Sequence, residues 1–344
     1  MKRDIKSLLL PELNEYLESK GEKTFRTQQV FSWLHSGVTS FHDMTNLSSE
    51  LRGKLDDEFY ITVPKLIEKH ISVIDGTVKY LWRVQDNDLV ECVLMEYSHG
   101  TTICISTQIG CKMGCIFCAS SLNGFKRNLS ASEILDQVIF TGLDINKRIS
   151  NVVLMGIGEP LDNFDNVMRF IDLVCHPEGI NLGARHVTLS TCGIIENIDK
   201  LAVYDVQLTL AISLHAPDDK TRSYLIPYNR ETGVAELLEA GKRYFNKTGR
   251  RITYEYALID GVNDTTAHAQ LLSQLLKNTA SHLNLILLSN IKENTLKASS
   301  KMNVDKFIEI LSKNGVHYTM RRSLGADIDA SCGQLRRRML RTEK

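Results

Sequence analysis

The sequence predicts an α/β fold built on parallel strands, and three observations point to it. From about residue 100 onward, apolar segments of strand length alternate with amphipathic segments of helix length. Polar or glycine-rich tips follow several of the strand-like segments. The chain before this region has a different pattern, first helical and then alternating. Repeated strand–helix alternation is typical of parallel βα units, which form either a barrel or a doubly wound sheet.

Residues 1–60 predict a small helical domain. Apolar side chains recur there at helical spacing in three stretches, which cover residues 8–17, 25–34 and 44–55. Residues 61–97 then predict a short β extension, because apolar residues alternate with polar ones and turn residues such as Asp75-Gly76 separate the runs. The alternating apolar residues are Ile71, Val73, Val78, Tyr80, Trp82, Val90 and Cys92. We expect these strands to be antiparallel to one another and to precede the main domain.

Residues 98–344 predict the main domain. Seven segments in it are candidate strands, at residues 102–107, 151–156, 185–190, 206–213, 251–258, 283–288 and 316–320. Helix-like stretches lie between them, for example at residues 132–143 and 234–244. In βα folds the ligand binds at the carboxyl ends of the strands. The tips at residues 156–160, 190–193 and 213–215 therefore predict one binding rim.

The composition narrows the classes of function. Lys and Arg together number 41, and Asp and Glu also number 41, so the net charge gives no general affinity for nucleic acid. A basic footprint has to be local, and the clearest one is the tail with Arg336, Arg337, Arg338 and Arg341. No apolar run approaches the roughly 20 residues of a membrane span, so we expect a cytoplasmic protein without a membrane partner. In that reducing compartment, the 8 cysteines predict metal ligands or redox groups rather than structural bridges.

Three closely spaced cysteines predict an iron–sulfur centre. Cys111, Cys115 and Cys118 have the spacing C-x3-C-x2-C and follow an apolar strand-like run. Three thiolates can bind three irons of a [4Fe–4S] cluster, which leaves the fourth iron with an open coordination position. A structural zinc site would need four ligands, usually as paired knuckles, and the sequence offers no second knuckle or histidine pair nearby. The spacing therefore favours iron over zinc.

The cysteine triplet and its flanks resemble the signature of the radical S-adenosylmethionine superfamily. In that superfamily the open iron binds S-adenosylmethionine through the amino and carboxylate groups of the cofactor. The segment Gly156-Ile157-Gly158-Glu159-Pro160 resembles the superfamily's motif that meets the amino group. It does not fit the dinucleotide-binding fingerprint, because Leu161 stands where the third glycine would be.

Further motifs resemble the RlmN/Cfr family of radical S-adenosylmethionine RNA methyltransferases. They lie at residues 106–111 (STQIGC), 118–120 (CAS), 127–129 (RNL), 213–217 (SLHAP) and 327–336 (DIDASCGQLR). The resemblance extends from the N-terminal helices to about residue 338. It implies a partial parallel (β/α)6 barrel of the radical S-adenosylmethionine type. The implied domains are residues 1–60, helical and RNA-binding, residues 61–97, the β extension, and residues 98–344, the core that ends in a catalytic-cysteine loop.

The resemblance implies methylation of carbon 2 of an adenosine. The expected substrates are the peptidyl transferase centre of 23S rRNA and the adenosine beside the anticodon in certain tRNAs. Carbon 2 lies between two ring nitrogens and is electron-poor, so it accepts a carbon radical but does not attack a methyl sulfonium. Two S-adenosylmethionine molecules are expected per turnover. The first methylates a cysteine, and the second yields a 5′-deoxyadenosyl radical that takes a hydrogen from that methyl group.

The family's roles transfer to matching positions of this chain. Cys332 is the expected S-methylcysteine intermediate, and Cys104 is the expected resolving cysteine, which releases the product by forming a transient disulfide with Cys332. Glu91, expected on the polar face of a strand, would accept the proton lost from carbon 2. The implied S-adenosylmethionine contacts are Gly158, Glu159, Ser190, Ser213, Leu214, His215 and Asn290. The cysteines expected only to pack are Cys92, Cys175 and Cys192.

Partners and rival functions follow from the same motifs. The expected partners are 23S rRNA, tRNA and an electron donor such as flavodoxin or ferredoxin, and we expect a monomer. A Cfr-type enzyme would instead methylate carbon 8 and confer antibiotic resistance, although Glu159-Pro160 is more similar to the carbon-2 type. A second alternative is a zinc-bearing RNA-binding module without catalysis. A third is a different radical enzyme, such as an activase or a thioether synthase, which would not need Cys332.

Overall fold

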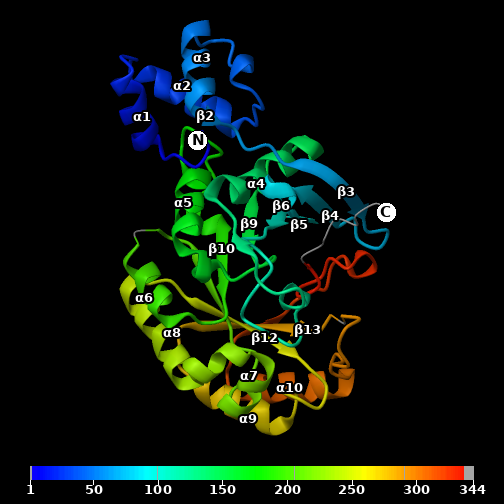
Figure 1. Ribbon diagram of the computed structural model, residues 1–344. Helices are drawn as coiled ribbons and strands as arrows, with labels where there is room; N and C mark the ends of the chain where they lie inside the picture. The colour runs from blue at the N-terminus through cyan, green and yellow to red at the C-terminus, as the bar shows by residue number, and fades with distance from the viewer. Residues whose placement is uncertain (1, 99, 205, 290, 337–344) are drawn as a thin grey trace.

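An N-terminal helical module begins the chain. The structure, a computed structural model, describes residues 2–98, 100–204, 206–289 and 291–336. The module lies at one end of the molecule in Figure 1 and consists of α1 (Leu10–Ser19), α2 (Phe25–His35) and α3 (Ser49–Glu58). Its start and end meet in two short parallel strands, β1 (Arg3–Asp4) and β2 (Phe59–Tyr60). Buried apolar residues from each helix, such as Leu17, Phe31 and Leu55, fill its interior.

The β extension is an antiparallel meander that continues the main sheet. It consists of β3 (Lys65–Ile71), β4 (Val78–Arg83) and β5 (Leu89–Tyr97), which pairs with β6 (Gly100–Cys104). The β4 residues from Val78 to Trp82 are buried on both faces, because α4 (Ala131–Ile145) covers one face and the C-terminal segment approaches the other. The expectation of a strand at Val73 is wrong. Val73 lies in the β3–β4 turn, and its side chain is 94% exposed.

The main sheet confirms the predicted parallel α/β class. Parallel pairings join β6 in chain order to β9 (Asn151–Leu154), β10 (Val187–Thr191), β11 (Thr209–Ser213), β12 (Ile252–Leu258), β13 (Ser281–Leu287) and β14 (Tyr318–Met320). Neighbouring strands follow one another along the chain without a reversal of order. The sheet therefore has the topology of a partial barrel and not of a doubly wound sheet.

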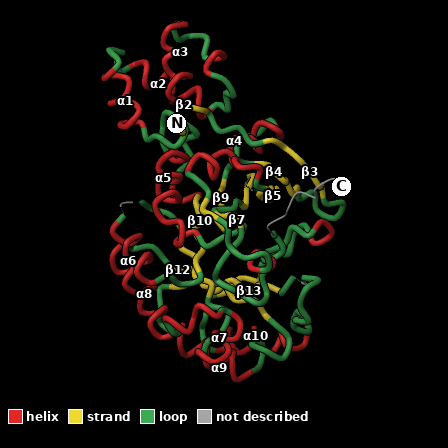
Figure 2. Tube along the Cα trace, viewed as in Figure 1, coloured by secondary structure: helices red, strands yellow, loops and turns green. Residues whose placement is uncertain are grey.

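Helices on the outside of the curved sheet connect its strands (Figure 2). After α4 they are α5 (Phe164–Cys175), α6 (Ile195–Val203), α7 (Asp219–Leu225), α8 (Val234–Thr248), α9 (Thr266–Leu276) and α10 (Lys301–Lys313). The apolar residues that face the sheet repeat at helical spacing, and Val167, Phe170 and Ile171 of α5, for example, are fully buried. Local sequence fixes the helix ends: the Ser130 hydroxyl accepts a hydrogen bond at the start of α4, and Gly249, with φ of +68°, ends α8.

Buried polar contacts fix the N-terminal module on the core. The Lys6 ammonium donates to the Asp136 carboxylate of α4 at 2.5 Å and to the Thr62 carbonyl oxygen at 2.6 Å. Both charged side chains are almost fully buried. At a second point, Arg169 of α5 forms an ion pair with Glu12 of α1. Because a buried ion pair tolerates little displacement of its partners, the module has one defined orientation on the core.

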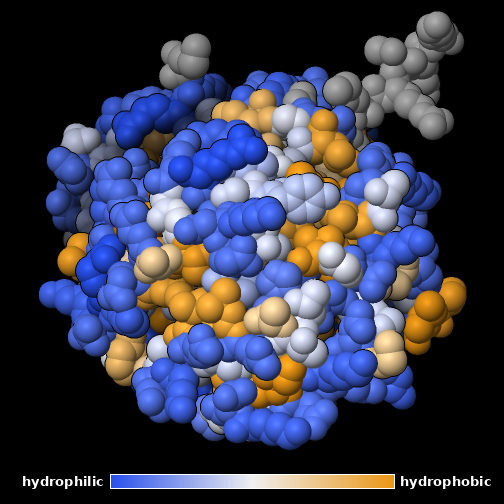
Figure 3. Space-filling view, turned by 90° about the horizontal axis from the view of Figure 1, so that it is seen from below, coloured by the Kyte–Doolittle hydropathy of each residue, from blue (hydrophilic) through white to orange (hydrophobic). Residues whose placement is uncertain are grey.

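The end of the molecule opposite the helical module has a mixed surface. Figure 3 shows this face, on which hydrophobic patches are separated by hydrophilic residues. Among the described residues, no helix is both long enough and apolar enough to cross a membrane.

Candidate active site

A pocket lies at the carboxyl ends of the parallel strands. Its empty volume, part of which is open to solvent, is about 970 Å³. Residues from the ends of β9, β10, β11 and β12 line it, together with the cysteine loop that follows β6 and the loop that contains Cys332. The strand tips that the sequence places on one rim therefore surround one cavity.

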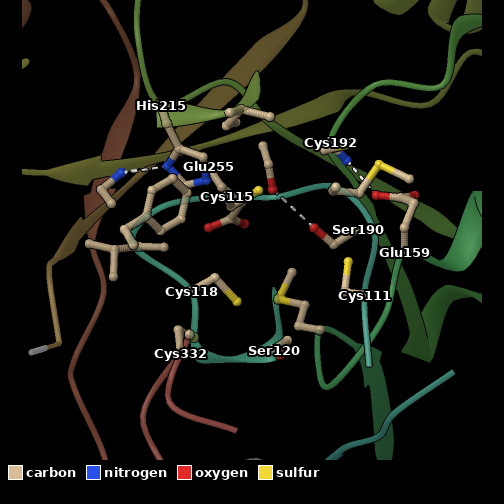
Figure 4. Close-up of a pocket in the computed structure, with 18 of the residues that line it drawn as sticks. Cys111, Cys115, Cys118, Ser120, Glu159, Ser190, Cys192, His215, Glu255 and Cys332 are labelled. Atoms are coloured by element: carbon tan, nitrogen blue, oxygen red, sulfur yellow. Dashed lines mark hydrogen bonds between the residues drawn. The ribbon is translucent and has the colours of Figure 1, made fainter. Parts of the chain in front are cut away.

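The three clustered cysteines face this pocket. Figure 4 shows the sulfurs of Cys111, Cys115 and Cys118 around one open space. Their loop begins with Gly110, whose φ is +80° and where a Cβ would lie 1.7 Å from the Gly124 carbonyl oxygen. Only glycine tolerates this approach, so the backbone alone fixes the start of the loop.

Burial makes these thiols weak acids when no cation is near. Burial raises the pKa of Cys111 to about 12, and burial followed by the neighbouring thiols raises the pKa of Cys115. Burial also raises the pKa of Cys118. Metal binds the thiolate form, so a positively charged centre has to replace the protons. Within the described residues, no three His, Cys, Asp or Glu side chains lie close enough together to bind one metal ion. In an iron–sulfur cluster each thiolate binds a different iron, so the three sulfurs do not have to meet at one point.

The segment after β9 approaches the end of β6 very closely. A Cβ on Gly156 would lie 2.6 Å from the Ile105 carbonyl oxygen. A Cβ on Gly158, whose φ is +108°, would lie 2.7 Å from the Gln108 Cβ. The two glycines are therefore required for the close packing of this segment against residues 105–108, and both glycines line the pocket.

Glu159 connects the tips of β9 and β10. Its carboxylate accepts hydrogen bonds from the Leu161 N–H at 3.0 Å and the Cys192 N–H at 2.8 Å, and Figure 4 shows the latter. Burial raises the pKa of Glu159 in spite of these bonds. The expectation that Cys192 only packs is incomplete, because it lines the pocket beside the cluster cysteines. The sequence contained a signal for this position, since Cys192 follows a strand at one of the predicted tips.

Ser190, Ser213 and His215 line the far side of the pocket. The two serine hydroxyl oxygens lie 3.5 Å apart. His215 Nδ1 accepts a hydrogen bond from the Ala257 N–H at 2.9 Å, and burial lowers the pKa of His215 to about 3. The ring is therefore neutral at physiological pH, and because Nδ1 is an acceptor, the ring hydrogen is on Nε2.

A buried arginine that the sequence did not indicate supports two of these tips. The Arg222 guanidinium donates to the carbonyl oxygens of Cys192 at 2.5 Å, Ser213 at 3.0 Å and Leu214 at 3.1 Å. It also donates to the Asn229 amide oxygen at 2.6 Å. The predicted contact Leu214 does not line the pocket, because its side chain is buried in the main core. Arg222 lies between Thr221 and Ser223 in a polar stretch of α7, so the sequence offered no signal for its burial or its partners.

A second, smaller pocket adjoins the first and contains two of the predicted cysteines. Cys104 and Cys332 both line it, and Cys332 also lines the first pocket. Cys332 is exposed, whereas burial raises the pKa of Cys104 to about 12. Met95 and Tyr97 of β5 form part of its wall. The structure thus brings the predicted methyl-carrying and resolving cysteines to one cavity.

Arg321 lies at the junction of the two pockets. It lines both, and its guanidinium lies 3.6 Å from the carboxylate of Glu255 on β12. Negative charge on Cys332, and then on Glu255, raises the pKa of Arg321. Burial raises the pKa of Glu255, while Arg321 and a 2.9 Å hydrogen bond from Asn284 favour its charged form. Neither Arg321 nor Glu255 was among the predicted site residues.

Glu91 differs from its predicted position. It was expected on a polar strand face, but only 1% of it is exposed, and it lines neither pocket. Its carboxylate accepts a hydrogen bond at 2.9 Å from the N–H of Arg336, which lies 245 residues later. Burial of this side chain depends on the C-terminal segment, so the local sequence could not predict it.

Some predicted positions fall elsewhere. Asn290, Arg337, Arg338 and Arg341 lie outside the described residues. Ser289, next to the first of these, lines both pockets. Cys92 is buried with its sulfur 3.7 Å from the Thr141 hydroxyl, and Cys175 ends α5, so neither belongs to the pocket walls.

Comparisons with known proteins match both parts of the chain. Residues 4–61 match the family model for the ribosomal RNA large subunit methyltransferase N-terminal domain, and residues 105–272 match the radical SAM superfamily. The probable dual-specificity RNA methyltransferase RlmN of Clostridium perfringens is 47% identical over 342 residues, 99% of each chain. The protein of that name from Clostridium botulinum is 49% identical over 335 residues, 97% of this chain and 98% of the relative.

A solved structure agrees with these matches. The crystal structure of a radical SAM methyltransferase from Sphaerobacter thermophilus has a TM-score of 0.91 and 39% sequence identity, and the match covers 96% of this chain and 98% of that one. The superfamily uses a [4Fe–4S] cluster and S-adenosylmethionine, and the three thiols beside a glycine-lined cleft fit that pair of cofactors. Given this fold, this pocket and identity close to one half over nearly the whole length, the chain belongs to the RlmN family of radical S-adenosylmethionine RNA methyltransferases.

Proposed function

We propose that this chain methylates carbon 2 of an adenosine in the peptidyl transferase centre of 23S rRNA, and of the adenosine beside the anticodon in tRNAs. The observation that carries the proposal is the second pocket, which Cys104 and Cys332 line together and which shares Cys332 and Arg321 with the pocket of the cysteine triplet. The RlmN relatives are named as dual-specificity RNA methyltransferases, which supports RNA as the substrate class. None of the compared relatives described above is named as a carbon-8 enzyme.

The first pocket would hold the cofactors. We assign the cluster to Cys111, Cys115 and Cys118, and S-adenosylmethionine to backbone and side chains around Glu159 and His215. The other proposed contacts are Gly158, Ser190, Ser213, the Leu214 backbone and Asn290. When bound, these cofactors supply a methyl group and a 5′-deoxyadenosyl radical. The neutral His215 ring can offer its Nε2–H to an acceptor without adding charge.

The second pocket would hold the base. Cys332 receives the methyl group on its sulfur, and after a hydrogen is removed from that group, the carbon joins carbon 2 of the base. The adduct gives up the carbon-2 hydrogen as a proton and one electron, which the cluster would accept. The Cys104 thiolate then attacks the Cys332 sulfur, so a disulfide forms and the sulfur–carbon bond breaks. The electron pair of that bond stays on the methylene carbon, which takes up a proton and becomes the methyl group of the product. Glu91 is the proposed acceptor of the proton from carbon 2. Since the Arg336 N–H occupies Glu91 in this structure, that role requires the C-terminal segment to shift.

The outer parts of the chain would bind RNA. A base that enters a buried pocket has to leave its stack, which costs a few kcal/mol, and contacts to the RNA backbone offset this. We propose that residues 1–60 form the RNA-binding domain, and that the arginine tail from Arg336 makes a second contact with the RNA backbone. Residues 61–97 would form the β extension, and residues 98–344 the catalytic core. The enzyme would act in the cytoplasm as a monomer with flavodoxin or ferredoxin as electron donor.

The test is an RNA product analysis. The protein is purified without air, its cluster is reconstituted, and it is incubated with 23S rRNA fragments and tRNA, followed by nuclease digestion and mass spectrometry. We expect 2-methyladenosine, and a product that is 8-methyladenosine would refute the carbon-2 assignment.

A matched pair of cysteine variants tests the methyl carrier. Cys332→Ala should lower product formation by about 10³-fold or more, because no other group would present the methyl carbon. Cys175→Ala should leave the product yield unchanged, since this cysteine ends α5 away from both pockets. Full activity of Cys332→Ala would overturn the scheme.

A further inference from the structure

The loop that contains Cys332 is attached at its root to the β3–β4 turn. Asp327 Oδ1 accepts a hydrogen bond from the Ser72 hydroxyl at 2.6 Å, and Asp327 Oδ2 accepts one from the Val73 N–H at 3.0 Å. Both carboxylate oxygens thus bind one turn that lies about 250 residues earlier in the chain. In Figure 1 the C-terminal segment, drawn in red, lies beside the end of β3.

Two further hydrogen bonds, one donated by the loop and one donated to it, strengthen the attachment. Asp75 Oδ2 in the turn accepts a hydrogen bond from the Gly325 N–H at 2.9 Å. The Lys79 ammonium of β4 donates to the Asp329 carbonyl oxygen at 3.1 Å. Burial would raise the pKa of Asp75, but its hydrogen bonds from Gly325 and Thr77 outweigh burial and lower it, so the carboxylate is charged near neutral pH.

Hydrogen bonds within the β3–β4 turn fix the conformation that makes this contact. The Ser72 hydroxyl accepts hydrogen bonds from the Ile74 and Asp75 N–H groups, each at 3.2 Å, while it donates to the loop. Packing is close as well: Gly325 has φ of +65°, and a Cβ there would lie 2.9 Å from the Thr77 methyl carbon. A rigid turn that meets the loop at this distance limits where the loop root can lie.

The tip of the loop is attached to a different partner. Cys332 is exposed, and the next residue, Gly333, accepts a hydrogen bond from the Ala119 N–H of the cysteine loop at 2.7 Å. The β3–β4 turn therefore holds Gly325 and Asp327, Lys79 of β4 holds Asp329, and the cysteine loop holds Gly333. Cys332, which lines both pockets, lies between these attachments.

We propose that the β3–β4 turn is a clamp for the Cys332 loop, and that Asp327 is its principal positioning residue. The proposal rests on the proposed function, in which the Cys332 sulfur first reacts in the pocket of the cofactors and then forms a disulfide with Cys104. A fixed root keeps the exposed Cys332 side chain within reach of both pockets, and rotation of that side chain can bring its sulfur from one pocket to the other. Asp327, the first aspartate of the segment DIDASCG, would therefore position the loop without taking part in the reaction.

The test measures local opening of the loop. Hydrogen exchange, read by mass spectrometry, is followed over residues 323–336 in the cluster-loaded full chain. Asp327→Asn should accelerate exchange there by about tenfold, because a hydrogen bond to a charged group is replaced by a weaker one. Asp329→Asn is the matched control in the same loop, since its backbone oxygen and not its carboxylate makes the contact with Lys79. It should leave the exchange unchanged.

Two further measurements distinguish a local effect on the Cys332 loop from a general loss of folding. Ser72→Ala should accelerate exchange in the same segment. In the Ser72→Ala/Asp327→Asn double variant the acceleration should be smaller than the product of the two single effects, because both changes affect the hydrogen bond between Ser72 and Asp327. RNA methylation by Asp327→Asn should show a lower kcat with an unchanged KM for RNA. If Asp327→Asn does not fold, Ser72→Ala alone decides.

The possible outcomes are distinct. Equal exchange in Asp327→Asn and Asp329→Asn, or an unchanged segment in Ser72→Ala, overturns the clamp whatever the wild type methylates. Accelerated exchange in a chain that methylates no RNA supports the clamp and removes only the proposed function.

Discussion

The two walls of the site are held in different ways. The wall of strand ends is held from inside, because Arg222 and Glu159 are buried and hydrogen-bonded to backbone groups of neighbouring tips. The wall formed by the Cys332 loop is held from outside, by the β3–β4 turn at its root and by single hydrogen bonds to the cysteine loop near its tip. Cys332 is exposed, whereas Cys111 is buried.

This difference suits two different tasks. A cofactor has to bind in one orientation, and a wall fixed by buried hydrogen bonds provides it. A residue that meets two partners in succession has to move, and a few hydrogen bonds of modest free energy permit this. Changes in the strand-end wall should therefore alter global stability and cofactor binding, whereas changes in the loop should alter local opening and Cys332 reactivity.

The largest effect is expected from the centre of the strand-end wall. Arg222→Met leaves the carbonyl oxygens of Ser213 and Leu214 buried without their donor, so we expect the free energy of unfolding to fall by about 3–5 kcal/mol. Binding of S-adenosylmethionine should weaken in parallel, because the tips that line the pocket lose their support. Anaerobic urea unfolding and equilibrium binding of the cofactor measure the two effects.

An exposed arginine provides the comparison. Arg243 pairs with Asp199 on the surface, and Arg243→Met should change the free energy of unfolding by less than about 1 kcal/mol. If Arg222→Met were no more destabilising than Arg243→Met, the strand-end wall would not be held from inside.

An intermediate effect is expected at the junction of the walls. Arg321→Met leaves Glu255 without its nearby cation, so the pKa of Glu255, already raised by burial, should rise further. A carboxyl whose folded-state pKa exceeds its unfolded value loses stability as pH rises above the unfolded value, about 4.3. The variant should therefore lose about 1–3 kcal/mol at pH 8 and less at pH 5, measured by urea unfolding at both pH values.

Removing the charge should reverse that loss. In the double variant Arg321→Met/Glu255→Gln no buried carboxylate remains at this position, so the difference between pH 8 and pH 5 should disappear. A loss that is independent of pH in Arg321→Met would show that the ion pair does not connect the walls.

The strands and their shared rim were accessible from the sequence because their causes are local. The predicted segment at 251–258 corresponds to β12, Ile252–Leu258, and the tips at 156–160 and 190–193 do line one pocket, since parallel strands end at the same edge. The segment predicted at 206–213 begins later, at Thr209, since apolar residues precede the first paired residue.

The rest of the site depends on contacts distant in the sequence. Arg222 receives its role from Cys192, 30 residues earlier, and Glu91 is buried under Arg336, 245 residues later. Neither pairing leaves a periodic pattern. Asp327 belonged to a recognised motif, but only the fold shows that it binds the β3–β4 turn.

The smallest effect is expected near the tip of the loop. The Ser120 hydroxyl donates to the Leu335 carbonyl oxygen at 2.8 Å and thereby connects the cysteine loop to the segment after Cys332. Ser120→Ala removes this hydrogen bond, whose net contribution is about 1 kcal/mol, and also the contact of the Ser120 side chain with the Cys118 thiol. Because the loop can open locally, we expect alkylation of Cys332 by iodoacetamide to accelerate about two- to fivefold, with little change in global unfolding.

The neighbouring serine is the matched control for this change. Within the described residues, the buried Ser121 hydroxyl has no hydrogen-bond partner, so Ser121→Ala should leave the alkylation rate of Cys332 unchanged. Peptide mass spectrometry distinguishes alkylation at Cys332 from alkylation at the cluster cysteines. Equal rates in both variants would mean that the Ser120 bond does not restrain the loop. A large loss of global stability in Ser120→Ala would mean that this wall is as firmly fixed as the strand ends, and the contrast between the two walls would fail.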